Sequence, residues 1–165
     1  MENYDSDSEI LIREHKVFNE RMGRLKNIAS ELDEISSTYA VQQLTSQIEK
    51  NPLELLAQLA DVLQLFGEGL RSHFVKEEKF FPDLASRFGG AETVSALLEE
   101  HKQVLKVVQE LNGRAVALAA SGAAASGDSK DELNDIISSL RNLLVTLSSH
   151  AEKEDEVLFI TGHNA

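Results

Sequence analysis

Residues 51–82 read NPLELLAQLADVLQLFGEGLRSHFVKEEKFFP, and their apolar residues recur at steps of three and four. This spacing places them on one face of an α-helix. Asn51 and Pro52 form a good cap and first-position pair for the start of that helix. The face consists of Leu55, Leu59, Val62, Phe66, Leu70, His73, Glu77 and Phe80. The sequence therefore predicts a helix whose buried face carries an imidazole and a carboxylate one turn apart.

The rest of the chain repeats the helical spacing, with only two prolines and no strand-like alternation. We expect helices over about 8–35 and 92–119, and a last helix opened by the capping-box pattern Ser129-Lys130-Asp131-Glu132. A short amphipathic tail after Pro82 leads to Gly89-Gly90, a helix stop. The segment 36–51 either holds a short helix around 40–50 or lengthens the first helix.

This pattern predicts an all-α fold, an up-down-up-down antiparallel four-helix bundle. The 165 residues suit a single domain over 1–165, with the bundle at about 8–160 and flexible tails at both ends. The segment 119–127 is rich in Ala, Ser and Gly and is expected to be a flexible connection.

Four of the five histidines follow an order that occurs twice along the chain, a lone His and then a His followed four residues later by Glu. The residues are His15, His73 with Glu77, His101, and His150 with Glu154. All of them fall on the apolar stripes. The midpoints between neighbouring histidines in the bundle, near residues 44, 87 and 125, fall in or beside the expected connections. The four histidines are therefore expected at one level of the bundle.

Burying four imidazoles and two carboxylates is costly unless each is paired or bound to metal. Two divalent cations would satisfy all six, with Glu77 and Glu154 bridging them. Nitrogen and oxygen ligands suit iron, zinc, copper or nickel, and spare coordination positions on a bridged pair favour iron. We therefore predict two carboxylate-bridged iron ions, with zinc or manganese as substitutes. His15 and His73 would hold one ion, and His101 and His150 the other.

The order of these six residues resembles that of the hemerythrin-like (HHE cation-binding) family over about residues 8–160. The resemblance implies a four-helix bundle with a non-haem di-iron site at these positions. Phe80-Phe81-Pro82, after the first His and Glu pair, also fits the family. Val157-Leu158-Phe159 is a weaker match at the corresponding place after the second pair. Oxygen-carrying members have a fifth histidine one turn after the third, where this chain has Leu105. One ligand fewer suggests open positions on the metals.

The choice of the bridging carboxylates leaves two alternates. Carriers in the family end with His-x-x-x-x-Asp, and Asp155 stands at that spacing from His150. We prefer Glu154 because a four-residue step keeps the helix face and a five-residue step does not. Glu78 is the comparable alternate beside Glu77. The acidic residues Glu14, Glu100, Glu152 and Asp155 are expected on solvated faces, although one could accept a hydrogen bond from a ligand imidazole. His163, in the polar tail, is not expected to be a ligand.

Composition excludes several classes of function. With 28 acidic and 16 basic residues the formal charge is −12, which disfavours nucleic acid and anionic membranes as partners. The absence of cysteine excludes disulfides, thiolate zinc sites and thiol nucleophiles. Apolar runs are short and the first residues are acidic, so we expect a cytoplasmic protein.

We expect a metal-binding protein that binds or senses a small oxidant such as O2, nitric oxide or peroxide, as the family resemblance implies. Three alternatives stay open at this point. The protein could store iron or donate it for repair of metal centres, act as a weak peroxidase or NO reductase, or use metal only to stabilise the bundle. No catalytic residue is assigned. The expected partner is a small diatomic or peroxide ligand, and the chain is expected to be a monomer or a weak homodimer.

Overall fold

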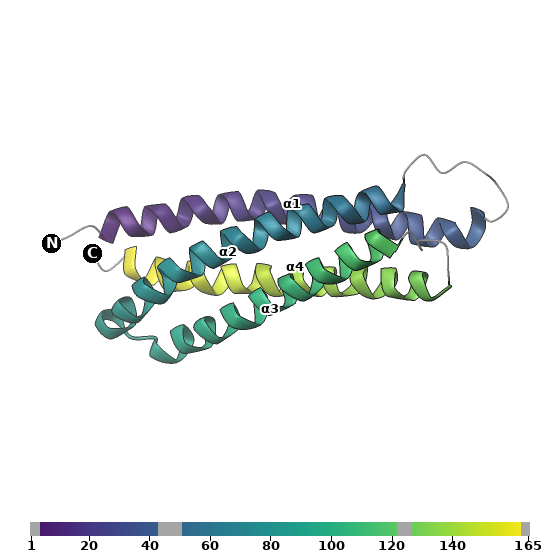
Figure 1. The fold of residues 1–165 in the computed structure, drawn as a ribbon. Helices are drawn as coiled ribbons and strands as arrows, with labels where there is room; N and C mark the ends of the chain where they lie inside the picture. The colour runs from purple at the N-terminus through teal and green to yellow at the C-terminus, as the bar shows by residue number, and fades with distance from the viewer. Residues whose placement is uncertain (1–3, 43–50, 122–126, 163–165) are drawn as a thin grey trace.

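The computed structural model describes residues 4–42, 51–121 and 127–162, and within these ranges it contains four helices. They are α1 (Tyr4–Gln42), α2 (Pro52–Phe88), α3 (Ala91–Ser121) and α4 (Gly127–Gly162). Neighbouring helices run in opposite directions, and α1 begins at the end of the bundle where α4 ends (Figure 1). The predicted all-α, up-down-up-down bundle is confirmed.

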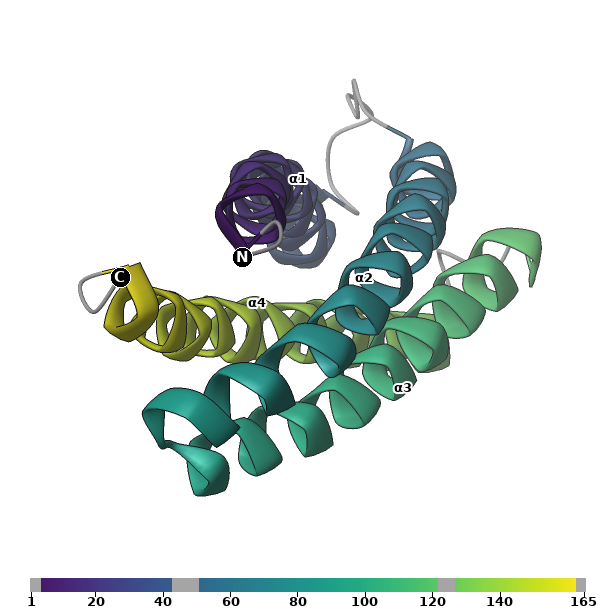
Figure 2. The ribbon, with the colours of Figure 1, turned by 90° about the vertical axis from the view of Figure 1, so that its left-hand side faces the viewer.

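Contacts between neighbouring helices form a closed ring around the bundle axis. Each helix contacts the next along the chain, and α1 also packs against α4. The contact between α2 and α3 is the most extensive, and these two helices lie side by side in the end view of Figure 2. Helices α1 and α3 lie across the diagonal from each other. A side chain from any of the four can therefore reach the central axis.

The ends of α2 follow the sequence signals. The Asn51 side chain accepts a hydrogen bond from the Leu53 backbone N–H at 3.0 Å, which caps the first turn. At the other end, the Gly89 N–H donates to the Ala85 carbonyl at 3.0 Å. Gly89 and Gly90 have φ values of 87° and 90°, a region that side chains disfavour, so this turn depends on glycine.

The last helix starts earlier than the expected cap at Ser129, whereas the tail after Pro82 continues α2 to the predicted stop and α1 lengthens into segment 36–51, one of the two expected alternatives. Helix α2 continues through Pro82 to Phe88, so the tail after Pro82 belongs to the helix. The missing N–H of Pro82 is tolerated because Phe81 and Leu84 are buried on either side of it, at 0% and 3% exposure. Helix α4 begins at Gly127, which places Ser129 inside the first turn rather than at the cap. Helix α1 extends to Gln42, and residues 43–50 lie outside the described part of the chain.

The core is divided into two apolar clusters by a polar layer. The larger cluster draws on all four helices and includes Leu32, Phe66, Leu111 and Ile136. The smaller cluster, near the α2–α3 turn, contains Leu11, Phe80, Phe81, Leu84, Val94 and Leu97. On α2 the polar residues at 73 and 77 fall between the two clusters. The polar layer therefore lies nearer the end of the bundle where α2 turns into α3.

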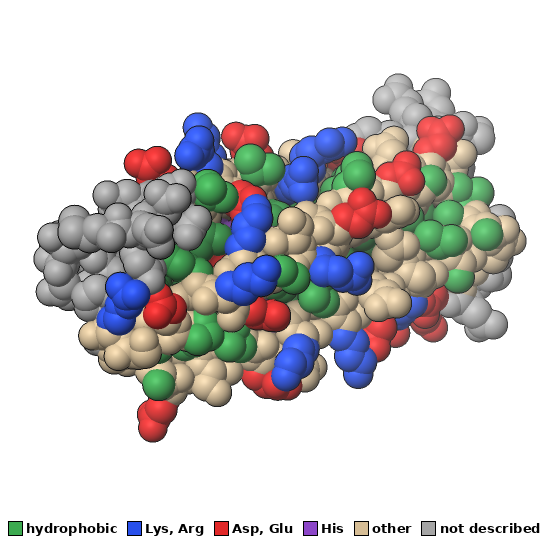
Figure 3. All heavy atoms as spheres, turned by 60° about the vertical axis from the view of Figure 1, so that its left-hand side comes forward, with side chains coloured by type: hydrophobic (Ala, Val, Ile, Leu, Met, Phe, Trp, Pro, Cys, Tyr) green, Lys and Arg blue, Asp and Glu red, His purple; other side chains and the backbone are tan. Residues whose placement is uncertain are grey.

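The surface carries mixed charge. On the face drawn in Figure 3, Lys and Arg side chains are interspersed with Asp and Glu, and no histidine side chain is visible there. Within the described ranges, no helix combines the length and apolar character that crossing a membrane requires.

Candidate metal centre

The polar layer contains all six side chains that the sequence predicts as ligands. Helix α1 contributes His15, α2 His73 and Glu77, α3 His101, and α4 His150 and Glu154. His15 is 9% exposed, and each of the other five is exposed by 2% or less. The helices hold them there because each belongs to an apolar stripe, so burial of the stripe carries the polar side chain inward.

Glu77 lies between the two pairs of histidines. Its Oε1 is 3.0 Å from His73 Nε2 and 3.5 Å from His15 Nε2. Its Oε2 is 3.4 Å from His101 Nε2. One carboxylate oxygen therefore faces each half of the site.

Glu154 repeats this arrangement from the opposite side. Its Oε1 is 2.6 Å from His150 Nε2 and 3.5 Å from His101 Nε2. Its Oε2 is 3.2 Å from His15 Nε2. Both carboxylates thus span the two halves, which is the arrangement that a bridging ligand requires.

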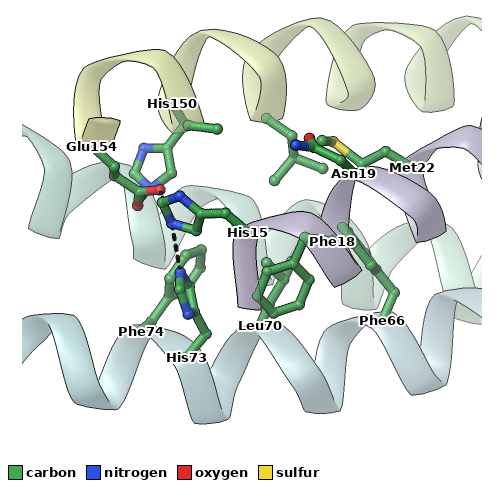
Figure 4. Close-up of a pocket in the computed structure, with 12 residues that line it drawn as sticks. His15, Phe18, Asn19, Met22, Phe66, Leu70, His73, Phe74, His150 and Glu154 are labelled. Carbon is green, nitrogen blue, oxygen red and sulfur yellow. Dashed lines mark hydrogen bonds and ion pairs between the residues drawn. The ribbon is translucent and has the colours of Figure 1, made fainter. Parts of the chain in front are cut away.

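We call His15 and His73 with the carboxylates beside them the first half of the site, and His101 and His150 with theirs the second half. In the first half, the ring nitrogens of the two histidines face one another. His15 Nε2 and His73 Nε2 are 3.1 Å apart, as the dashed line in Figure 4 shows. Candidate ligand atoms converge in two groups, one formed by His15, His73, Glu77 and Glu154 and one by His101, His150 and Glu154. The structure therefore pairs the histidines as the sequence predicts.

The outer nitrogens of three histidines contact carboxylates. His73 Nδ1 is 2.8 Å from Glu14 Oε2, and His150 Nδ1 is 2.8 Å from Glu100 Oε2. His15 Nδ1 is 3.1 Å from Asp155 Oδ1. When Nδ1–H donates to a carboxylate, the lone pair of a neutral imidazole is on Nε2 and faces the centre. The contacts thus favour the tautomer that a metal ligand needs.

The two alternate carboxylates lie outside the site. Asp155 is 67% exposed and reaches His15 from the outer side. Glu78 is 49% exposed, and its Oε1 is 3.8 Å from His101 Nδ1, beyond hydrogen-bond distance. Glu77 and Glu154 are therefore the carboxylates that face the four Nε2 atoms. Their neighbours Glu78 and Asp155 lie instead on the Nδ1 side of His101 and of His15.

His101 is oriented by an aromatic ring instead. The Phe74 ring stacks on the His101 ring with centroids 3.8 Å apart and planes at 3°. Phe74 directly follows His73, and the residue that follows His150 is Ala151. The two halves therefore differ at this position, where the second carries a methyl group in place of a ring.

A pocket of about 30 Å³ lies beside the first half of the site. It is lined mainly by apolar side chains, with His15, His73, His150 and Glu154 along one side (Figure 4). Ala151 is among the lining residues, so its small side chain contributes to the open space. About 10–15 Å³ of such volume admits one water molecule, and the pocket therefore suits a ligand of two or three atoms.

The charges of the site compensate one another. Burial lowers the pKa of His15, but the carboxylates of Glu154 and Glu77 outweigh it and raise that pKa to about 10. The same balance raises the pKa of His101 to about 9. Burial raises the pKa of Glu77 and Glu154, yet the surrounding imidazoles hold both below the usual range. A divalent cation among these groups would take the place of the imidazole protons.

Several buried polar atoms form no hydrogen bond of normal geometry within the described part of the chain, although oppositely charged atoms lie 2.6–3.5 Å from several of them. They are Glu77 Oε1 and Oε2, His101 Nδ1 and Nε2, His150 Nε2 and Glu154 Oε1. Five of these six atoms face the centre of the site. A buried polar atom left wholly unsatisfied costs about 1–3 kcal/mol, and poorly directed contacts recover only part of that cost. Cations at the centre would satisfy them, so the residues present fit a metal site.

Sequence reasoning missed two contributions to the site. Lys76 and Lys153 form ion pairs with Glu14 and Glu100, and neither lysine was assigned a role. The stacking of Phe74 was also missed. A signal for the lysines exists, because His-x-x-Lys-Glu occurs at 73–77 and again at 150–154. His163 and the side chains from Leu158 onward lie outside the described part of the chain.

The fold and the buried His and Glu cluster define a helical-bundle protein with a candidate cation site. The model of the hemerythrin HHE cation-binding domain matches residues 6–160. The chain therefore belongs to the hemerythrin HHE cation-binding family, and membership implies metal binding. No curated protein and no solved structure matches it.

Proposed function

We propose that the six residues hold a carboxylate-bridged pair of iron ions and that the protein binds or senses a small oxidant such as O2, nitric oxide or peroxide. His15 and His73 would hold one ion, and His101 and His150 the other. Glu77 and Glu154 would bridge, because each presents one oxygen to each half. The convergence of buried imidazole nitrogens and carboxylate oxygens that lack hydrogen bonds of normal geometry carries this proposal.

The choice of iron rests on the donor set and on the number of donors. Each half offers two imidazoles, and the two carboxylates are shared between the halves. Where oxygen-carrying relatives have a further histidine, Leu105 packs against the larger apolar cluster. An iron pair held by so few protein ligands would keep open positions and would supply redox chemistry for a small oxidant.

The chain's own residues would prepare the site for such a ligand. The pocket beside His15 and His73 admits molecules of two or three atoms and is largely apolar. Phe18 and Phe74 lie along its walls and exclude bulk water from the adjacent imidazoles (Figure 4). A small and largely apolar pocket would favour a diatomic or peroxide-sized ligand over larger polar ones.

Metal analysis combined with optical spectroscopy tests the proposal. Protein expressed in iron-replete medium is expected to contain about two iron equivalents. Air exposure of the reduced protein should produce an oxo-to-iron absorption band, and nitric oxide should change the spectrum of the reduced form. Less than about half an iron equivalent together with no such band would refute the di-iron site.

Metal donation is a second candidate, and the exposure of the His15 side favours it. His15 is the most exposed of the six, and its Nδ1 partner Asp155 is 67% exposed. A donor should release iron to a moderate chelator within minutes, whereas a site that binds an oxidant should retain it. Competition with a graded series of chelators separates the two functions.

A further inference from the structure

The first half of the site carries an outer contact of three side chains. Glu14, which directly precedes His15 on α1, reaches across to α2. Its Oε2 is 2.8 Å from His73 Nδ1, and its Oε1 forms an ion pair with Lys76. Lys76 lies one turn after His73 on the same helix, so the two side chains hold one carboxylate between them.

The second half repeats this contact atom for atom. Glu100 directly precedes His101 on α3 and reaches across to α4. Its Oε2 is 2.8 Å from His150 Nδ1, and its Oε1 forms an ion pair with Lys153. Again the lysine follows the histidine by three residues on the same helix.

These two contacts differ from the ordinary ion pairs of the surface. An exposed pair such as Glu99 with Lys102, at 61% and 71% exposure, contributes little because both side chains stay solvated. Glu14 and Glu100 are 29% and 32% exposed. Each carboxylate contacts a lysine with one oxygen and a buried imidazole with the other. The ion pair therefore holds the carboxylate in place, and the carboxylate in turn holds the imidazole ring.

We propose that Glu14 with Lys76 and Glu100 with Lys153 are two positioning clamps, each of which controls how tightly its own half of the site retains metal. The clamp holds His73 or His150 with Nδ1–H toward the carboxylate and Nε2 toward the centre. The other two histidines lack such a clamp, since His15 meets the exposed Asp155 and His101 stacks on Phe74. This inference rests on the proposed two-metal site.

The clamps act on separate halves, which gives the test its sharpest form. His73 Nε2 lies beside His15 Nε2 in the first group of ligand atoms, and His150 belongs to the second. A variant of Glu14 should therefore weaken one metal position and a variant of Glu100 the other. A general loss of stability would affect both positions alike.

The experiment follows the release of Fe(II) from the loaded, anaerobic protein into an excess of a chromogenic ferrous chelator. In Glu14→Leu and in Glu100→Leu, one of the two equivalents should leave about 10- to 100-fold faster than from the unaltered protein. Glu14→Gln and Glu100→Gln should show smaller accelerations, because the amide oxygen still accepts from Nδ1. Glu99→Leu is the matched control, since Glu99 neighbours Glu100 but pairs only outside the site.

Acceleration of both equivalents by the same factor, or of neither, overturns the proposal. Should a leucine variant fail to fold, Lys76→Met and Lys153→Met keep the imidazole acceptor and test the same clamps. Each should speed one equivalent, and Lys76→Met should add nothing in a Glu14→Gln background. Additive effects of the two changes would contradict the clamp. Failure of the unaltered protein to bind two metals is a separate result, and it refutes the proposed function instead.

Discussion

Replacing Ala151 with valine tests whether the pocket beside His15 and His73 admits the small ligand. Ala151 lines this pocket, whose volume is about 30 Å³. Ala151 follows His150 as Phe74 follows His73, and the Phe74 side chain is a ring that stacks on His101. Valine adds two methyl groups on the wall of the pocket and leaves all six proposed ligands unchanged.

The magnitude follows from the space available. At about 10–15 Å³ for each water, the pocket has room for about two waters, which the two added methyl groups would occupy. Their burial contributes up to about 1.6 kcal/mol, at about 0.8 kcal/mol for each carbon. The lower helix propensity of valine opposes this by about 0.5–0.7 kcal/mol. The free energy of unfolding should therefore change by less than about 1 kcal/mol, while ligand affinity falls at least about tenfold.

The assay is an equilibrium titration of the reduced, iron-loaded protein with nitric oxide, followed by absorption, together with urea unfolding. Ala117→Val is the matched control, because Ala117 is an exposed residue of α3 that does not line the pocket. Unchanged nitric oxide affinity in Ala151→Val would refute the assignment of the pocket to the ligand. A loss of stability above about 2 kcal/mol would show that the pocket is too small to hold two added methyl groups.

Three other perturbations give measurable outcomes. Removing metal with a chelator should lower the melting temperature, followed by circular dichroism, by roughly 10–20 °C, because two sites at a hundredfold excess over Kd contribute about 5 kcal/mol; an unchanged melting curve contradicts this. Metal uptake at pH 7 should release about two protons, since His15 and His101, with pKa values of about 10 and 9, are protonated there and must lose their protons to bind metal. Metal affinity should accordingly rise with pH up to about 10, where His15 has also lost its proton, and calorimetry in buffers of different ionisation enthalpy detects the protons or their absence. Pro82→Ala should raise the free energy of unfolding in urea by about 2 kcal/mol, because it restores an N–H inside α2 at an exposed position, and a decrease would contradict this reasoning.

The helices and their level in the bundle were predictable because they depend on local information. An apolar residue every three or four positions fixes which face of a helix is buried. Equal chain lengths on either side of each turn then fix which histidines lie side by side. Apolar spacing and chain length together predict His15 and His150 in one layer although they are far apart in sequence, and the structure confirms that layer.

The continuation of α2 through Pro82 as far as the predicted stop at Gly89-Gly90 depends on tertiary packing instead. Proline disfavours a helix interior locally, and the sequence offers no direct measure of what opposes it. The burial of Phe81 and Leu84 against α1 and α3 residues of the smaller cluster keeps α2 helical beyond that point. Packing between helices decides this continuation, as it often does when propensity and burial disagree.

By itself, the sequence determined the fold class, the four faces that are buried and the six polar side chains that those faces carry inward, because each follows from periodicity along one helix. Only the tertiary structure decided what surrounds these side chains. Glu154 and Asp155 are neighbours in sequence, yet one lies among the four Nε2 atoms and the other contacts His15 from outside. The clamps of Glu14 and Glu100 likewise join different helices. Such contacts depend on how each helix is rotated about its axis, which packing between helices sets.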